Sequence, residues 1–303
     1  MVDVQNSAPA SATSLAISLP VTDWHPALDP DFHRRAAETL EGGNVLVLPD
    51  LPFGLTDEER TYLRPDAVKE GTKTIKYDRK EDRVWGTADQ AGETVLRGML
   101  KRYAEETQAL VLALFPGYDK ALKFGVTSFR PVEAQGRKQS TRHDDTLLHV
   151  DAFPSRPSAG QRIMRVFTNI HPGDKPRVWR IGEPFETVAK RFLPKVSAPI
   201  PGSAAFMNLV GLTKAKRTAA DHYMLKLHDT MKFDAVYQRD CPRQQVEFRP
   251  GTTWMVFTDQ VSHAAISGQH ALEQTFTLDI AGMVHPETSP LRVLERLKGK
   301  KLH

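Results

Sequence analysis

The sequence predicts a mainly β fold with a helical buttress, an α+β arrangement whose strands form a sandwich or jelly roll. After about residue 122 the chain reads as short apolar or alternating segments between Gly, Pro and Asp breaks, a pattern typical of such folds. Before that point, helical periodicity predominates. The 303 residues, 40% of them hydrophobic, are enough to bury one sizeable core.

A helical layer is expected at the N-terminus. Apolar residues recur at helical spacing over 31–41, and the apolar stretch 44–49 follows as a short strand that proline ends. Helical spacing returns over 93–114, which predicts a buttressing helix packed on the sheet. Residues 1–20 are rich in Ser and Ala and lack periodicity, so we expect a disordered leader. Residues 21–303 are then expected to form a single domain.

One predicted helix, 218–233, interrupts the later strands, and its stripe of Tyr223, Leu227 and Met231 is expected to be core. A short basic amphipathic helix is predicted over 291–301. Its leucines either dock on the domain, as we expect, or touch a membrane surface. The predicted strands are 122–131, 146–153, 161–170, 176–180, 204–210, 245–249, 253–258 and 273–281.

Composition narrows the class of protein. No apolar run approaches the roughly 18 residues that a membrane span needs, and no basic segment followed by an apolar one indicates a secretory signal. The single cysteine, Cys241, excludes an internal disulfide and fits a reducing compartment. A cytoplasmic protein is therefore expected.

The basic residues are clustered, although the net charge is only +4. Each cluster by itself is consistent with a solvated face, but together they favour an anionic partner such as a phosphorylated glycolipid, a membrane surface or nucleic acid. The clusters are Lys69, Lys73, Lys76, Arg79, Lys80 and Arg83; Lys214, Lys216 and Arg217; and Lys298, Lys300 and Lys301.

One segment carries the clearest chemical signal. His149 and Asp151 stand two apart in an apolar run, so on a strand both face the same side. A second histidine from a distant segment would complete a two-His, one-carboxylate face, the arrangement typical of non-heme Fe(II) oxygenases. His263 is the candidate. A rival His-x-Asp at 143–145 lies among polar residues and is expected in a loop, and the motif alone fits a core histidine equally well.

A double-stranded β-helix carries such a pair near the end of one strand and the distal histidine on a late strand. Fe(II) held in this way leaves positions for a bidentate 2-oxo acid and O2. The far carboxylate of a 2-oxo diacid is best anchored by arginine, yet 273–278, after His263, contains none. Arg162 and Arg165 are the candidates, with Gln274 as a further co-substrate contact. The two arginines are three positions apart, so on a strand their side chains point to opposite faces and at most one reaches inward.

Four longer runs are far more specific than the His-x-Asp pair: 149–157, 165–170, 176–185 and 227–232. They resemble the Kdo 3-hydroxylase family, and the likeness extends from about residue 70 to about residue 285. The resemblance implies a cupin-like double-stranded β-helix that uses Fe(II), 2-oxoglutarate and O2 and releases succinate and CO2. It also implies hydroxylation at C3 of 3-deoxy-D-manno-oct-2-ulosonic acid (Kdo) in Kdo–lipid A. The metal ligands that it implies are His149, Asp151 and His263.

Arg177 and Arg180 flank Trp179 in a segment expected to line the barrel mouth, where paired guanidiniums suit a sugar acid. The alternative is a core tryptophan between two solvated arginines. His143 is a further candidate for the acceptor site. An acceptor at the cytoplasmic membrane face would explain the basic clusters, so transient peripheral contact is expected. No nucleic-acid partner is expected, and the oligomeric state stays open.

Two other functional classes remain open from the residues alone. A jelly roll with histidine ligands also hosts Zn²⁺ or Mn²⁺ in isomerases and lyases. Alternatively, a non-catalytic module would bind anionic lipid or nucleic acid through the basic clusters, and it would keep its affinity after His149→Ala.

Overall fold

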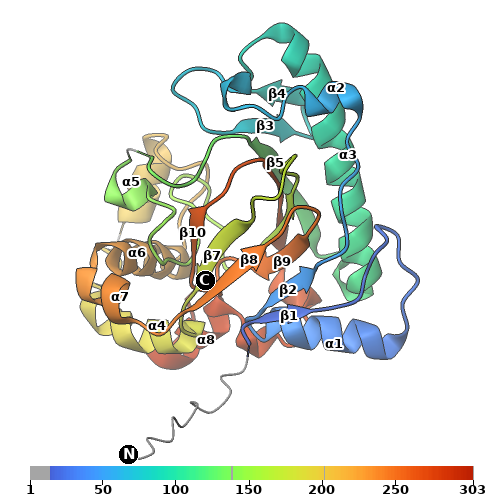
Figure 1. Ribbon diagram of the computed structural model, residues 1–303. Coiled ribbons are helices and arrows are strands. Elements are labelled where there is room, and N and C mark those ends of the chain that lie inside the picture. The colour runs from blue at the N-terminus through green and yellow to red at the C-terminus, as the bar shows by residue number, and fades with distance from the viewer. Residues whose placement is uncertain (1–13, 138, 201, 303) are drawn as a thin grey trace, which may run out of the picture.

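The computed structural model describes residues 14–137, 139–200 and 202–302. Within these ranges the strands assemble into two sheets with helices on either side (Figure 1), so the fold is mixed α+β, as predicted. The strands are β1 (Ala16–Ser18), β2 (Val45–Leu48), β3 (Ile75–Asp78), β4 (Arg83–Trp85), β5 (Leu122–Arg130), β6 (Arg162–Asn169), β7 (Arg177–Ile181), β8 (Gln244–Phe248), β9 (Thr253–Phe257), β10 (His263–Ser267) and β11 (Ala271–Leu278). The helices are α1 (Pro30–Glu41), α2 (Asp57–Arg60), α3 (Gln90–Leu114), α4 (Phe185–Phe192), α5 (Ser203–Leu209), α6 (Ala219–Phe233), α7 (Ala235–Asp240) and α8 (Pro290–Lys298).

The large sheet has the strand order β1-β2-β9-β6-β11-β5-β3-β4, and the small sheet has the order β10-β7-β8. β6 lies inside the large sheet, antiparallel to both β9 and β11. Because side chains alternate between the faces of a strand, Met164 and Val166 share one face, and Arg165 and Phe167 share the other. The first face packs against the helices, and the second faces the small sheet.

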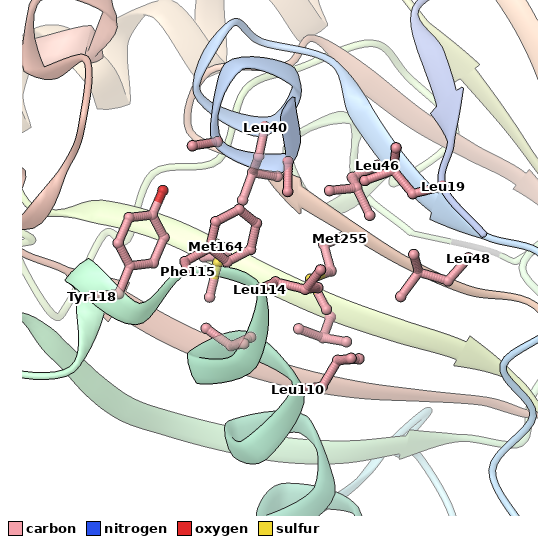
Figure 2. Packing of buried hydrophobic residues seen from close by; sticks show 14 of the residues in the cluster. Leu19, Leu40, Leu46, Leu48, Leu110, Leu114, Phe115, Tyr118, Met164 and Met255 are labelled. Carbon is pink, nitrogen blue, oxygen red and sulfur yellow. The ribbon is translucent and has the colours of Figure 1, made fainter. Parts of the chain in front are cut away.

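Helices α1 and α3 cover the first face of the large sheet. Figure 2 shows Leu40 of α1 and Leu110 and Leu114 of α3 beside Met164 and Met255 of the sheet. All five side chains are fully buried, and burial of each such side chain stabilises the fold by roughly 1.5–3 kcal/mol. This packing fixes the sheet whose opposite face carries the candidate site.

The sequence marks the ends of these helices. Asp29 accepts a hydrogen bond from the backbone N–H of Phe32 at 2.7 Å, and Pro30 occupies the first turn of α1. Asp89 caps α3 in the same way, through the N–H of Gly92 at 2.6 Å. The predicted helices over 31–41 and 93–114 are therefore confirmed, as is the apolar strand that became β2.

Aromatic rings fill the space between the two sheets. Trp254 of the large sheet stacks on Phe248 of the small sheet, with ring centroids 4.0 Å apart. Phe167 meets Trp179 edge to face at 5.0 Å. Trp179 in turn stacks on His263, with centroids 5.2 Å apart. The inter-sheet core therefore extends to the first strand residue of β10, where the site begins.

The two predicted C-terminal helices are present. Thr218 and Asp221 form a capping box at the start of α6, and Leu227 and Met231 are fully buried, so this stripe is core. Leu291 and Leu294 of α8 are 5% and 0% exposed. The leucines of α8 thus dock on the domain, as expected, and do not face outward. Among the helices of the described residues, none is long and apolar enough to cross a bilayer.

Two of the predicted strands are wrong. The segment 204–210 lies mostly in helix α5, because a short apolar run of helix-forming Ala, Met and Leu has no period that identifies a strand. The segment 146–153 begins in a turn and forms only one bridge, between His149 and His263. Its neighbouring backbone groups bond elsewhere: the N–H of Leu148 donates to the side chain of Gln238, and that of Asp151 to Thr258 O. No single strand therefore runs alongside it.

The predicted leader is wrong for residues 14–20, and its remainder, 1–13, lies outside the described residues. β1 pairs in parallel with β2, Ala16 opposite Val45, and Leu19 is buried. Contacts made far along the chain order this segment, and no local period signals them. Strands β3, β4 and β10 and helices α4 and α7 were also missed, since each is too short to show a clear period.

Candidate metal centre

The antiparallel bridge between His149 and His263 brings two distant segments together. The N–H of each residue donates to the carbonyl of the other, at 3.0 and 2.9 Å, and the ring centroids lie 4.7 Å apart. Asp151 Oδ1 lies 3.6 Å from His149 Nε2. One ligand atom from each of the three residues lies within 4.8 Å of the others. The three side chains therefore converge as the sequence predicts. That they bind a metal stays a prediction.

Two hydrogen bonds set the tautomer of the imidazoles. His149 Nδ1 lies 2.7 Å from Leu147 O, and His263 Nδ1 lies 2.8 Å from Val261 O. Since a carbonyl oxygen only accepts, each neutral ring carries its proton on Nδ1 and keeps the lone pair on Nε2. Burial and the adjacent His149 ring lower the pKa of His263 to about 4. The donor set thus fits a divalent transition metal: two imidazoles with Nε2 available and one carboxylate.

Arg165 holds the third candidate ligand. Its Nη2 lies 2.8 Å from Asp151 Oδ2, and its Nη1 contacts Glu273. Burial by itself raises the pKa of Asp151, but the Arg165 guanidinium holds that pKa well below its usual range. Glu273 is also paired with Arg130, whose Nε lies 2.6 Å from it. Asp151 is therefore ionised, and two arginines share the charge of Glu273.

A cavity that we call the inner cavity lies between the two sheets beside these residues. Arg177 of β7 lines it, is 3% exposed and donates from Nη1 to Gly268 O at 2.8 Å. Within the described part of the chain, Arg177 Nε has no hydrogen-bond partner and no carboxylate lies within ion-pair distance of this guanidinium. Burial and the cations Arg130 and Arg137 lower the pKa of Arg177 to about 10. The lining residues are Arg130, Asp145, His149, Asp151, Arg165, Phe167, Arg177, Trp179, His263, Ala265 and Glu273.

A second cavity, the outer cavity, lies on the other side of the candidate centre. The two cavities share Asp145, His149 and Asp151, so a metal held by the three candidate ligands would face both. The outer cavity is rich in cationic side chains. Its lining residues are Lys73, Arg142, His143, Asp145, His149, Asp151, Ala152, Pro154, Arg217, His222, Leu225, Lys226, His228, Asp229 and Lys232.

Parity separates the two arginines of β6. Arg162 is fully buried on the helix-facing side, where its Nε lies 2.9 Å from Asp259 Oδ2 and its Nη2 donates to Gln260 at 2.7 Å. The proposed co-substrate role of Arg162 therefore does not fit, because its guanidinium is saturated and lines neither cavity. Arg165 points into the inner cavity, as the parity argument allows.

Two more candidates point away from the inner cavity, again by parity. Gln274 neighbours the inward-facing Glu273 on β11 and is fully buried, with its Oε1 accepting from Thr127 Oγ1 at 2.5 Å. Arg180 is an odd number of positions from Arg177 on β7, so the expected pair of guanidiniums is split between two faces of the small sheet. Neither Gln274 nor Arg180 lines either cavity, and His143 lines the outer one.

Arg130, His228 and Lys232 were missed by the sequence argument. Arg130 ends β5 and lies in the inner cavity, whereas His228 and Lys232 lie on α6 and reach the outer cavity. A charged residue at the end of a predicted strand is a usable signal for the first. The α6 pair lies within the run 227–232 that carries the family resemblance, but helical spacing alone does not show that these polar residues reach a cavity.

Comparisons with known proteins identify the family to which this chain is similar. A family model described as 3-deoxy-D-manno-oct-2-ulosonic acid (Kdo) hydroxylase matches residues 23–301. A crystal structure of the Kdo hydroxylase KdoO, a non-heme Fe(II) alphaketoglutarate-dependent dioxygenase, with alphaketoglutarate and Fe(III) is 47% identical, with a TM-score of 0.91 over 95% of this chain and 97% of that chain. Its cobalt(II) complex gives 47% and 0.92 over the same shares, and its complex with succinate and Fe(III) gives 46% and 0.91. No curated protein matches the sequence.

Proposed function

The chain belongs to the Kdo hydroxylase family, and from this premise we propose that it adds a hydroxyl group at C3 of the Kdo residue of Kdo–lipid A. The enzyme is an Fe(II)- and 2-oxoglutarate-dependent dioxygenase that uses O2. The observation that carries the residue-level proposal is the convergence of His149, Asp151 and His263 between an arginine-lined cavity and a lysine-rich one.

Bound Fe(II), together with 2-oxoglutarate and O2, would insert one oxygen atom into a C–H bond of the acceptor while 2-oxoglutarate becomes succinate and CO2. The chain's own residues hold and orient the reactants. The Nε2 atoms of His149 and His263 and one oxygen of Asp151 would bind the metal. Arg165 keeps Asp151 ionised and in place, the role that outer partners of metal ligands commonly have.

Arg177 is the proposed anchor for the far carboxylate of 2-oxoglutarate. Arg165 was one of the two expected anchors, but its charge is already shared by Asp151 and Glu273. Arg130 is likewise paired with Glu273. Arg177 is a buried guanidinium in the inner cavity with an unused Nε–H. A planar donor fork of this kind suits a carboxylate, and leaving it without one is costly.

The outer cavity is the proposed acceptor site. Its cations, Arg142, His143 and Lys232 among them, suit a sugar acid attached to a phosphorylated lipid. We also propose that the two sheets form the jelly roll, the cupin-like double-stranded β-helix, expected from the sequence. The isomerase, lyase and non-catalytic readings lose their support, because the family is one of hydroxylases.

Transient contact with an anionic membrane surface, at the inner face of the cytoplasmic membrane, is proposed for the segment 209–217. Leu209, Val210 and Leu212 are 84%, 48% and 65% exposed. The neighbouring Lys214 and Lys216 are also exposed, and Arg217 lines the outer cavity. Apolar side chains beside cations at a cavity mouth fit such a surface.

Vesicle sedimentation tests this contact. Leu209→Ser with Leu212→Ser should weaken binding to vesicles of phosphatidylcholine and phosphatidylglycerol, and wild type should bind poorly to phosphatidylcholine alone. Equal binding by wild type and the double variant would refute the role of the segment.

The enzymatic proposal is tested by anaerobic loading with Fe(II) and 2-oxoglutarate, followed by O2 with and without Kdo–lipid A. We expect succinate to form with the acceptor, and the acceptor to gain one oxygen atom. A protein that binds the acceptor but never decarboxylates 2-oxoglutarate would contradict it.

A further inference from the structure

We propose that Lys232 binds the carboxylate of the acceptor and thereby selects the C–H bond that faces the metal. This inference rests on the proposed function and assigns one specificity-determining residue within the acceptor site.

Lys232 is a buried cation with spare donors. It lies in the last turn of α6, is 3% exposed, and its Nζ donates to Arg142 O at 3.0 Å. An ammonium group carries three N–H donors, and this contact uses one. Among the described residues, no carboxylate oxygen lies within ion-pair distance of Lys232, while the nearby Asp145 is paired with Lys73 at 3.5 Å. Asp145, Asp151 and Asp144 act on Lys232 only from beyond ion-pair distance. A buried ammonium without a direct ion-pair partner is unfavourable, so an anionic ligand would complete this site.

The position of Lys232 separates it from the co-substrate. Lys232 lines the outer cavity together with His149 and Asp151, and it does not line the inner cavity. Arg177, in contrast, lines the inner cavity and does not line the outer one. Two anions, the co-substrate and the acceptor, therefore meet different cations on the two sides of the candidate metal centre.

The chemistry of the acceptor links carboxylate binding to regioselectivity. In a 3-deoxy-2-ulosonic acid, C1 is the carboxylate, C2 is the ketose carbon and C3 is a methylene. C3 is therefore two bonds from the carboxylate carbon. A cation that fixes the carboxylate inside the cavity of the metal ligands confines C3 to a small volume, and reaction rates depend steeply on such positioning.

The neighbours of Lys232 are themselves held in place. Arg142 Nη2 lies 2.9 Å from Asp229 Oδ2, and His228 Nδ1 lies 3.0 Å from Asp229 Oδ1. The His228 ring meets the His149 ring edge to face, with centroids 5.4 Å apart. One face of α6 thus presents Lys232 and His228 to the same cavity, with Asp229 fixing its rim.

The decisive experiment compares Kdo–lipid A with its Kdo methyl ester as acceptors, for wild type and Lys232→Met. Wild type should prefer the free carboxylate by about 10- to 100-fold in kcat/KM, the range for a charge-assisted hydrogen bond. Lys232→Met should lose this preference because its KM for the free-acid acceptor rises. It should also form less hydroxylated acceptor for each succinate produced from 2-oxoglutarate. Lys232→Arg should retain part of the preference.

Two further variants separate recognition from a structural role. Lys232→Gln keeps a donor for Arg142 O but removes the charge, so it should also lose the preference for the free carboxylate. If Lys232→Gln retained the wild-type preference for the acid over the methyl ester, the proposal would be overturned. Lys101→Met, at an exposed position of α3, should behave as wild type. The KM for 2-oxoglutarate and the acceptor-independent formation of succinate should be unchanged in all variants. A wild type that forms no succinate would instead contradict the proposed function itself.

Discussion

Arg165 Nη2 lies 2.8 Å from Asp151 Oδ2, whereas the other carboxylate oxygen, Oδ1, lies on the side of His149 Nε2 at 3.6 Å. An arginine in the middle of a regular strand thus orients a carboxylate in a segment that has almost no strand pairing of its own. The precision of the candidate centre comes from β6 as much as from the segment that carries His149 and Asp151.

Arg165→Gln is expected to weaken metal binding by about 10- to 100-fold, the usual effect of removing a partner that orients a ligand. Arg165→Lys should recover part of this loss. Anaerobic calorimetric titration with Co(II) measures the affinity. An unchanged affinity in Arg165→Gln would show that Asp151 needs no such support.

Arg177→Met should raise the KM for 2-oxoglutarate by about 10- to 100-fold, because a buried charge-assisted contact is lost. Metal affinity should stay the same. Arg180→Met is the matched control, since it removes an arginine from the opposite face of the same strand and should leave this KM unchanged. Steady-state succinate formation measures both. A larger effect of Arg180→Met than of Arg177→Met would reverse the assignment.

Arg162→Met is expected to destabilise the fold by about 3–5 kcal/mol, because it leaves Asp259 buried without its partner. Arg162 is fully buried, and its guanidinium also lies 3.8 Å from the centroid of the Phe257 ring. Urea unfolding gives the change in the free energy of unfolding. The exposed pair of Arg34 and Glu38 offers a control, and Arg34→Met should leave the free energy of unfolding nearly unchanged. A 2-oxoglutarate KM that rises in folded Arg162→Met, with little loss of stability, would contradict the structural role.

His270 should make the stability of the metal-free protein depend on pH. It is 3% exposed, and burial together with the nearby His171 lowers its pKa from 6.5 to about 4. Between these values the unfolded chain binds a proton that the folded chain does not, so stability falls as pH decreases from 6.5 towards 4.

His270→Asn should flatten that dependence by up to about 1.4 kcal/mol per pH unit, the limit for one proton. Asparagine is chosen because the residue has φ 55, a left-handed conformation that asparagine tolerates. Unfolding by urea at a series of pH values checks this. Equal slopes for the two proteins would mean that His270 is not the titrating group.

Strong periodicity and parity explain what the sequence could predict. The long helix α3, and the placement of Arg162 and Arg165 on opposite faces of β6, follow from periods of 3.6 and 2 that extend over several residues. Convergence of the distant His263 on His149 was expected from the fold and the resemblance, although the strand β10 that positions it was missed. Its register against β7 depends on contacts that no local pattern records.

The co-substrate anchor escaped prediction for a different physical reason. Arg162, Arg165 and Arg177 all lie on strands, and the sequence does not reveal which carboxylates neutralise each of them. Only the structure brings Glu273 next to Arg165 and Asp259 next to Arg162. These pairings leave Arg177 with the unused charge.

The most direct test of the account is an anaerobic Fe(II) titration of wild type and of the single variants His149→Ala, Asp151→Ala and His263→Ala, with His285→Ala as a histidine control away from the site. We predict one tight site per chain in wild type and in the control, with an affinity at least about 100-fold lower in each of the three variants. Wild-type affinity in any of those three would contradict a centre built from these side chains.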